Sequence, residues 1–249
     1  MPNYTRNIIK MKGIAELPLF DEDGCFDFNK IIPMPEELKD TNSGTFTEKC
    51  IVCFLTEKGS IGLNELNKRK KEINEILGSI VYHFNESDFV GLIHEILAED
   101  NDLDAMYEEG RKYVENYRKY GACTWYEWAC QNWSTKWNAC NTEIVDEDTI
   151  KFSTAWCSPM RILFELSNMY PDAEIETWYA SEEIGYEDGY RIFKNGAIIK
   201  GNIDKDMPPM SQEAYETYVK CWGVSNCLYK DTDGHWKKHD CENCNGCNW

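Results

Sequence analysis

One dipeptide, Asn195-Gly196, constrains this chain more than any other local feature. It lies between two short runs that contain apolar residues, 190–194 and 197–200. Asn-Gly in this position is typical of a two-residue type I′ hairpin, because both turn residues need a positive φ angle that Asn and Gly tolerate. The sequence therefore predicts two antiparallel strands that meet at residues 195 and 196.

Apolar periodicity predicts the remaining strands and the helices that pack on them. Alternating or short apolar runs predict strands at residues 3–13, 141–156 and 173–180. Helical spacing predicts helices that begin near Thr124, Ser158 and Ser211. Thr124 and Glu127 form a capping box, and Ser158-Pro159 is an N-cap followed by proline.

This order of elements predicts an α+β fold, a ferredoxin-like helix-on-antiparallel-sheet sandwich. The term ferredoxin-like refers to the topology alone and does not imply an iron–sulfur cluster. Residues 1–56 and 122–204 form the predicted core, and residues 57–121 a helical insertion with three amphipathic helices. Residues 50–55 are either a short buried strand or the start of the insertion, and residues 36–48 a loop. Residues 205–249 are predicted as a C-terminal helix and a Cys-rich tail.

The chain of 249 residues carries a formal net charge of −18. Nucleic-acid phosphates are bound by clustered Lys and Arg, so we expect no direct nucleic-acid binding. An acidic surface serves solubility, or it competes with nucleic acid for a basic site on another protein. The basic run at residues 67–72 fits a solvated helix face.

The chain has neither a signal-peptide pattern at its start nor an apolar stretch long enough to span a membrane. We therefore expect a cytoplasmic protein with no membrane partner. In a reducing compartment, twelve Cys residues indicate free thiols or metal ligands before disulfides.

Five Trp residues crowd into residues 125–156 together with polar groups. Trp side chains bury large areas, and they also form ligand walls, so the cluster is either core or a small-ligand pocket. The candidate ligand-binding residues are Trp125, Asn132, Trp133, Thr135, Lys136, Trp137 and Trp156.

The tail offers a candidate metal site. Cys and His at short spacing are ligands for zinc, and the candidates are Cys227, His235, His239, Cys241, Cys244 and Cys247. Cys50 and Cys53 could complete a four-thiolate site. The alternatives are an iron–sulfur cluster, for which the fourth Cys-Pro is missing, and a thiol-rich tail without metal.

Two longer stretches, residues 26–38 and 125–139, resemble the YubB-type ferredoxin-like proteins of plasmids and phages. Residues 152–160 and 166–171 and the opening residues agree, so that the match covers about residues 1–40 and 120–202. The chain departs from the family pattern at Ser134 and at Ser158-Pro159. The resemblance implies a ferredoxin-like fold and a genomic setting, that of an accessory protein of a phage or plasmid. It does not imply any particular activity.

No catalytic signature such as a Walker A motif, HExxH or GxSxG occurs in the sequence. We therefore expect a binding protein of a phage or plasmid, with no enzymatic activity, that uses its acidic surface to engage or inhibit a host nucleic-acid-binding or defence protein. The alternative is a small-ligand or nucleotide-binding protein or enzyme with a Trp-lined pocket near Lys136.

Overall fold

The structure is a computed structural model that describes residues 3–61, 68, 71–76, 78, 91, 93–97, 102–202 and 206–239. The chain forms two compact units, a sheet unit from the first 33 residues and residues 132–249, and a helical unit from residues 34–131. Among the described helices, none is both long and apolar enough to cross a membrane.

The sheet unit is built on six antiparallel strands in the order β2-β3-β1-β4-β5-β6. The first strand therefore lies inside the sheet, where Ile8 faces Lys151 on one side and Trp178 on the other. The strands are β1 (Tyr4–Lys10), β2 (Cys140–Asp146), β3 (Thr149–Ala155), β4 (Ile175–Ser181), β5 (Gly189–Lys194) and β6 (Ala197–Gly201).

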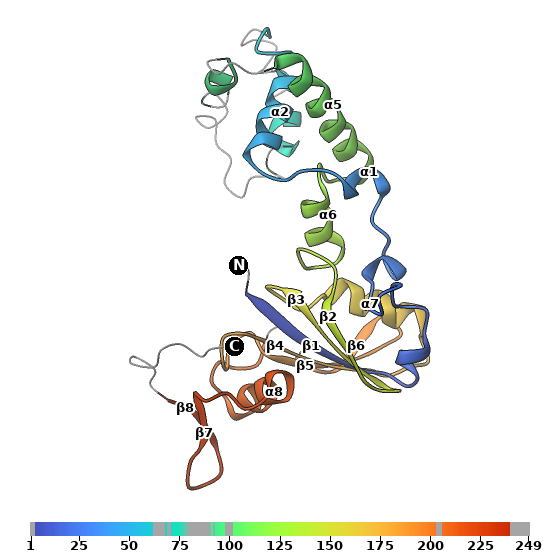
Figure 1. Cartoon of the computed structure of the whole chain (residues 1–249), viewed down its shortest axis with the longest axis vertical. Helices are drawn as coiled ribbons and strands as arrows, with labels where there is room; N and C mark the ends of the chain where they lie inside the picture. Colours follow the sequence, from blue (N-terminus) through green and yellow to red (C-terminus); the bar gives the residue numbers. More distant parts are fainter. Residues whose placement is uncertain are drawn as a thin grey trace. The chain divides into compact units, whose positions relative to one another are not determined.

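Two helices cover opposite faces of this sheet, as Figure 1 shows: α7 (Met160–Met169) and α8 (Gln212–Trp222). On the α7 face, Phe164 packs edge-on against Phe193 with ring centroids 5.1 Å apart. Phe26 and Phe152 extend the same apolar core at 5.1 Å. The sheet unit is thus the α+β, ferredoxin-like arrangement that the sequence predicts.

The α8 face holds a second core that contains Ile8, Ala180, Tyr215, Tyr218 and Cys221. Ser211 caps α8 as predicted, because its side chain accepts a hydrogen bond from the Ala214 backbone N–H at 3.1 Å. A short hairpin, β7 (Leu228–Lys230) and β8 (Trp236–Lys238), follows α8 in the segment predicted as a tail.

The predicted type I′ hairpin is confirmed. Asn195 has φ 48° and Gly196 has φ 69°, and Lys194 pairs with Ala197 across the turn. The capping box is confirmed as well, because the Glu127 carboxylate accepts a hydrogen bond from the Thr124 backbone N–H at 2.9 Å. The predicted Ser158 cap is wrong: α7 begins after Pro159 without a side-chain cap.

The helical unit contains α2 and α5, which pack along each other. Gly110 is the point of closest approach, because a Cβ added there would lie 1.9 Å from the Cys50 carbonyl oxygen. Residues 71–76 and 93–97 are also helical; the rest of the first two predicted insertion helices lies outside the described residues. The labelled helices are α1 (Glu36–Lys39), α2 (Thr45–Leu55), α5 (Leu103–Tyr120) and α6 (Trp125–Asn132).

The observed units differ from the predicted boundaries of the insertion. The helical unit begins at Met34 and ends at Gln131, so it takes in residues that the sequence assigned to the core on both sides. Residues 50–55 are the end of α2 and not a strand, and residues 36–48 hold α1 and the start of α2. An apolar run of six residues fits a buried helix as well as a strand, which explains the ambiguity.

We expect Gly110→Ala to destabilise the protein by about 1–3 kcal/mol, because the new methyl group overlaps the α2 backbone. This loss outweighs the gain of about 1 kcal/mol that Ala brings to a helix interior. Urea-induced unfolding followed by helical circular dichroism measures the effect. Glu108→Ala, at an exposed position of the same helix, is the control, and a Gly110→Ala variant as stable as this control contradicts the packing.

Candidate functional site

The structure divides the predicted Trp cluster between core and surface. Trp133 is 3% exposed, packs edge-on against Phe28 and donates its indole N–H to the Ile32 carbonyl at 2.9 Å. Thr135 is buried and donates to the Ala155 carbonyl at 2.8 Å. Trp125 belongs to the helical unit, and Asn132 is the last residue of α6. These four residues are therefore not brought together as a ligand site.

Lys136, Trp137 and Trp156 are brought together as predicted. The Lys136 Nζ lies 5.1 Å from the Trp137 ring centroid and 5.2 Å from that of Trp156. A cation over an aromatic face is attracted by the ring quadrupole, so Lys136 holds the two rings in place. Trp156 is 41% exposed, the highest exposure among the large hydrophobic residues at this site.

Trp156 lies at the mouth of a pocket of about 170 Å³ in the sheet unit. The loop before α7 supplies one wall, strands β4 and β5 supply the base, and the segment before α8 closes the side. The lining residues are Trp156, Cys157, Ser158, Met160, Tyr179, Glu187, Arg191 and Asp206.

Two lining residues have an unusual backbone. Trp156 has φ 69° and Glu187 has φ 53°, in the left-handed region that bulky residues rarely adopt. Such residues cost about 1–3 kcal/mol each and cluster at binding and catalytic sites. The chain thus accepts strain at the two positions that frame the pocket.

Arg191 is the cation that lines the base of the pocket, and it is 7% exposed. Its Nε donates to the Asn202 carbonyl at 2.6 Å, and its guanidinium lies 4.9 Å from the Tyr179 ring centroid. One terminal nitrogen is 3.8 Å from the Asp206 carboxylate, which also accepts the Tyr179 hydroxyl. Arg191 is therefore held rigidly by groups from three segments.

The carboxylates near the pocket outnumber this cation. Partial burial and the charges of Asp206 and Glu183 raise the pKa of Glu187. Asp188, next in the chain, is 1% exposed, and neither of its side-chain oxygens has a hydrogen-bond partner among the described residues. Its burial first, and then the charges of Asp206 and Glu187, raise the pKa of Asp188 to about 8. A buried acid without a cationic partner favours its neutral form.

Ser158 adds an unsatisfied polar group to the wall. It is 5% exposed, and its hydroxyl has no hydrogen-bond partner in the described part of the chain. Buried polar atoms in native proteins are nearly always paired, so an unpaired hydroxyl that lines a pocket is a natural contact for a guest.

The sequence did not predict Glu187, Arg191, Asp206 or Asp188 as part of a site. One signal was present, because Arg191 stands at an inward-facing position of a strand with apolar neighbours. The other three lie in connecting segments, where a carboxylate is an ordinary surface residue, and only the folded chain brings them together.

The predicted zinc ligands are partly separated. Cys227 and His239 lie at the open end of the β7–β8 hairpin, where the His239 N–H donates to the Cys227 carbonyl at 2.8 Å. His235 lies at the turn, about 13 Å away along an extended strand. These three residues do not form a ligand group among the described residues. Cys241, Cys244 and Cys247 lie outside the described residues, so zinc at the tail stays a prediction.

Cys50 and Cys53 do not fit a thiolate site. Both are fully buried in the core of the helical unit. Burial raises the pKa of Cys50 to about 12 and also raises that of Cys53. In this structure the two residues pack as apolar core residues, and their part in a four-thiolate site stays a prediction, because Cys241, Cys244 and Cys247 lie outside the described residues.

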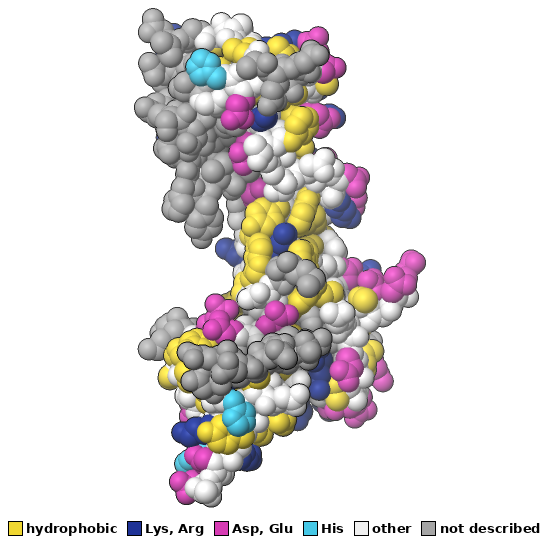
Figure 2. Space-filling view, turned by 60° about the vertical axis from the view of Figure 1, so that its left-hand side comes forward, with side chains coloured by type: hydrophobic (Ala, Val, Ile, Leu, Met, Phe, Trp, Pro, Cys, Tyr) yellow, Lys and Arg dark blue, Asp and Glu magenta, His cyan; other side chains and the backbone are white. Residues whose placement is uncertain are grey.

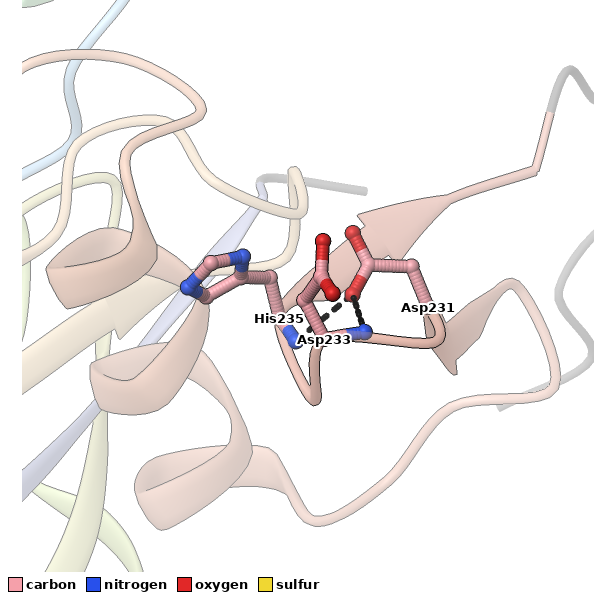
Figure 3. Close-up of side chains that lie close together, drawn as sticks. All are labelled: Asp231, Asp233 and His235. Atoms are coloured by element: carbon pink, nitrogen blue, oxygen red, sulfur yellow. Dashed lines mark hydrogen bonds between the residues drawn. The ribbon is translucent and has the colours of Figure 1, made fainter.

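A different set of residues at the hairpin turn could hold a metal ion: Asp231, Asp233 and His235, with one ligand atom from each within 4.8 Å of the others (Figure 3). The dashed lines mark the Asp231 carboxylate accepting the backbone N–H groups of Asp233 and His235 at 3.0 and 2.9 Å. Asp21 accepts from Asp23 and Cys25 in the same way at 3.0 and 2.8 Å. The arrangement is therefore a repeated Asp-x-Asp-Gly turn, which explains the geometry without a metal.

We expect Trp156→Gly to keep or raise the melting temperature, because Gly adopts a positive φ without strain. The strain relieved is about 1–3 kcal/mol, the usual cost of such a residue. Differential scanning calorimetry measures the change, with the buried Trp133→Gly as the destabilised comparison. A loss of stability in Trp156→Gly comparable to that of Trp133→Gly would show that the exposed ring is a packing residue.

We expect the free energy of unfolding to fall as the pH rises from about 4 to about 8 because of Asp188. The folded state keeps its proton up to about pH 8, whereas the unfolded chain releases it near 3.8, so the unfolded state binds fewer protons in between. The slope contributed is at most about 1.4 kcal/mol per pH unit. Urea unfolding from pH 5 to pH 9 tests this.

Asp188→Asn should remove this slope, so that its stability exceeds that of the parent protein by a margin that is smaller at pH 5 and largest at pH 9. Asp172→Asn, at an exposed position of the same unit, should change neither value. Parallel pH profiles for the parent protein and Asp188→Asn would contradict the buried acid.

Comparison with known proteins supports the fold of the sheet unit. Residues 132–223 match the family model described as ferredoxin-like domain in Api92-like protein. Among solved structures, the protein api92 from Yersinia pseudotuberculosis is similar at 10% sequence identity, over 84% of this chain and 100% of that chain, with a TM-score of 0.33. A TM-score this low supports no argument. The search of curated proteins found no match.

The match corrects the family suggested by the sequence. Residues 132–202, which belong to the part that resembled YubB-type proteins, match the Api92-like model instead, so the expected relationship is wrong. The expected setting in a phage or plasmid rested on that resemblance and is withdrawn with it. What the match supports is the ferredoxin-like fold of residues 132–223.

Proposed function

We propose that this protein is a binding protein that engages a basic partner protein, and that the pocket beside Trp156 receives a Lys or Arg side chain of that partner. One observation carries the proposal: the carboxylates at this pocket exceed the cations. Glu187 and Asp206 line it against the single Arg191, and Asp188 is buried beside them.

The electrostatics favour a cationic guest. The charges of Asp206 and Glu187 raise the pKa of Asp188, in the same direction as its burial. The repulsion between these carboxylates is therefore not neutralised by the protein. A guest cation would lower the pKa values of both Asp188 and Glu187 and so release the free energy now spent on repulsion. An anionic guest would add to the same repulsion.

The size of the pocket also supports a side chain as the guest. Pockets for drug-sized ligands and cofactors occupy roughly 300–1,000 Å³. The volume of about 170 Å³ at Trp156 is smaller, and it is open beside an exposed aromatic ring. A flexible apolar stem with a charged end, as in Lys or Arg, fits such a space, with the stem along Trp156 and the cation toward Glu187 and Asp206.

The charge of the whole surface contributes less than the pocket. Figure 2 shows acidic side chains in several separate groups on the visible face, with basic side chains between them. Surface charges of mixed sign steer a partner weakly, whereas partly buried groups are screened less by salt. We therefore place the specificity in the pocket and assign to the net charge of −18 a role in long-range attraction.

The proposal keeps the cytoplasmic location expected from the sequence. Cys50 and Cys53, buried in the core of the helical unit, are thiols, a state that a reducing compartment maintains. It leaves out a nucleotide at Lys136, because the pocket beside Trp156, at about 170 Å³, is smaller than the usual site for such a ligand.

We expect Glu187→Gln to weaken the binding of a short Lys- and Arg-containing peptide about tenfold, the effect of losing one charge-assisted hydrogen bond. The full chain is titrated with the peptide, and the indole N–H signal of Trp156 in the NMR spectrum shows whether the peptide reaches the pocket. Affinity is measured by calorimetry at two salt concentrations.

Glu147→Gln is the matched control, because it removes the same charge from an exposed turn that does not line the pocket. Its affinity should stay within about twofold of the parent protein. Equal losses in the two variants, or a peptide that leaves the Trp156 signal unmoved, would contradict a binding site at this pocket.

A further inference from the structure

A groove of about 310 Å³ lies on the opposite face of the sheet, between α8 and strands β4 and β5. This volume is within the range of small-ligand sites. Its sheet side is aromatic and its helix side is polar, since it is lined by Trp178, Tyr190, Met207, Glu213, Glu216 and Lys220 among others.

The aromatic side is a platform of two rings that are inclined to each other. Trp178 and Tyr190 are paired across β4 and β5, and their ring centroids lie 5.2 Å apart with planes inclined by 34°. The Tyr190 hydroxyl donates to the Glu176 carboxylate at 3.4 Å, a long bond that keeps the ring near the strand edge. Aromatic side chains of this kind bind planar ligands by stacking.

One end of the groove is basic. The Lys220 Nζ lies 3.2 Å from the Trp178 ring centroid, so this cation is fixed by an aromatic ring. Lys220 is in no ion pair among the described residues, so its charge is available to a ligand.

Two further cations adjoin Lys220. The register of the sheet places Lys10 diagonally beside Trp178, and Lys151 opposite Ile8 on the next strand. Partial burial on the Trp178 ring lowers the pKa of Lys220, Glu176 opposes this, and Lys10 and Lys151 lower it further. Lys10 and Lys151 also have no ion pair in the part of the chain that is described. Three lysines therefore face one carboxylate, Glu176, and this excess of positive charge favours an anion.

We propose that this groove binds a nucleoside 5′-phosphate, with the base against the Tyr190 ring beside the Lys220-covered Trp178 and the phosphate at Lys220, Lys10 and Lys151. The site has three parts, which are aromatic rings, a group of lysines and two carboxylates. A ligand that matches all three carries a planar ring, an anionic group and hydrogen-bond donors. The carboxylates of Glu213 and Glu216 would accept from ribose hydroxyls or amino groups of the base, a role that a simple aromatic anion leaves unfilled.

The site is independent of the proposed pocket for a basic side chain. The two sites are lined by different residues. Trp178 lines the groove, and its neighbour in β4, Tyr179, lines the pocket on the other face of the sheet. A long nucleic-acid strand does not fit this proposal, because beyond Lys220, Lys10 and Lys151 it would meet a protein with a net charge of −18.

The test is titration of the full chain with AMP and ATP in the absence of divalent cations, followed by Trp fluorescence and calorimetry. We expect both nucleotides to bind more tightly than adenosine. Lys220→Met, which keeps an apolar stem over Trp178, should weaken ATP binding by about tenfold or more. Lys10→Gln, at an exposed position, should weaken it several-fold without a change in melting temperature.

Lys12→Met is the matched control, because it removes one positive charge from the exposed turn after β1, and it should change ATP affinity by less than about twofold. Glu187→Gln should leave ATP affinity unchanged, which separates this site from the Trp156 pocket. Equal affinity for adenosine and ATP would overturn the phosphate site. Equal affinity for ATP and inorganic triphosphate would overturn the stacking groove, and no binding at millimolar ATP would overturn both.

Discussion

The pairing of β1 with both β3 and β4 is the constraint on which the sheet unit depends. Thr5 lies opposite Thr154 on one side and Ser181 on the other, so that one strand near the start of the chain joins residues far along it. Contacts of such long range must overcome the entropy of closing a large loop, and they do so here by placing β1 in the middle of the sheet. Residues 34–131 are inserted in the chain between β1 and the strands that pair with it, and they form a unit of their own.

The same pairing fixes which side chains share a face. Because successive residues of a strand point to opposite faces, the register that puts Asn7 beside Tyr179 also puts Ile8 beside Trp178. The first pair faces α7 and the Arg191 pocket, and the second faces α8 and the aromatic groove. Two sites of different chemistry can therefore be built on the same two strands, and a shift of one residue in β4 would exchange their linings.

Local signals were predictable from sequence, and assembled sites were not. The Asn195-Gly196 turn and the Thr124–Glu127 capping box form because short-range sterics and hydrogen bonds decide them. Residues 50–55 became helix because α2 packs against Gly110 of α5, which no local pattern encodes. Of the predicted Trp cluster, Lys136, Trp137 and Trp156 come together, while Trp133 is used to fill the core. The carboxylates around Arg191 come from segments whose proximity is a property of the fold.

The net charge of the chain is a poor guide to what its surface binds. A sum of −18 describes the field at a distance, which repels a polyanion and attracts a basic protein. At physiological ionic strength that field decays over about 8 Å, so a small ligand responds to the groups it touches. Lys220, Lys10 and Lys151 outnumber the neighbouring Glu176, which leaves a local excess of positive charge, whereas Glu187 and Asp206 outnumber Arg191, which leaves a local excess of negative charge. Each excess costs free energy in the unbound protein, and a ligand of opposite sign at either place removes that cost without any change in the fold.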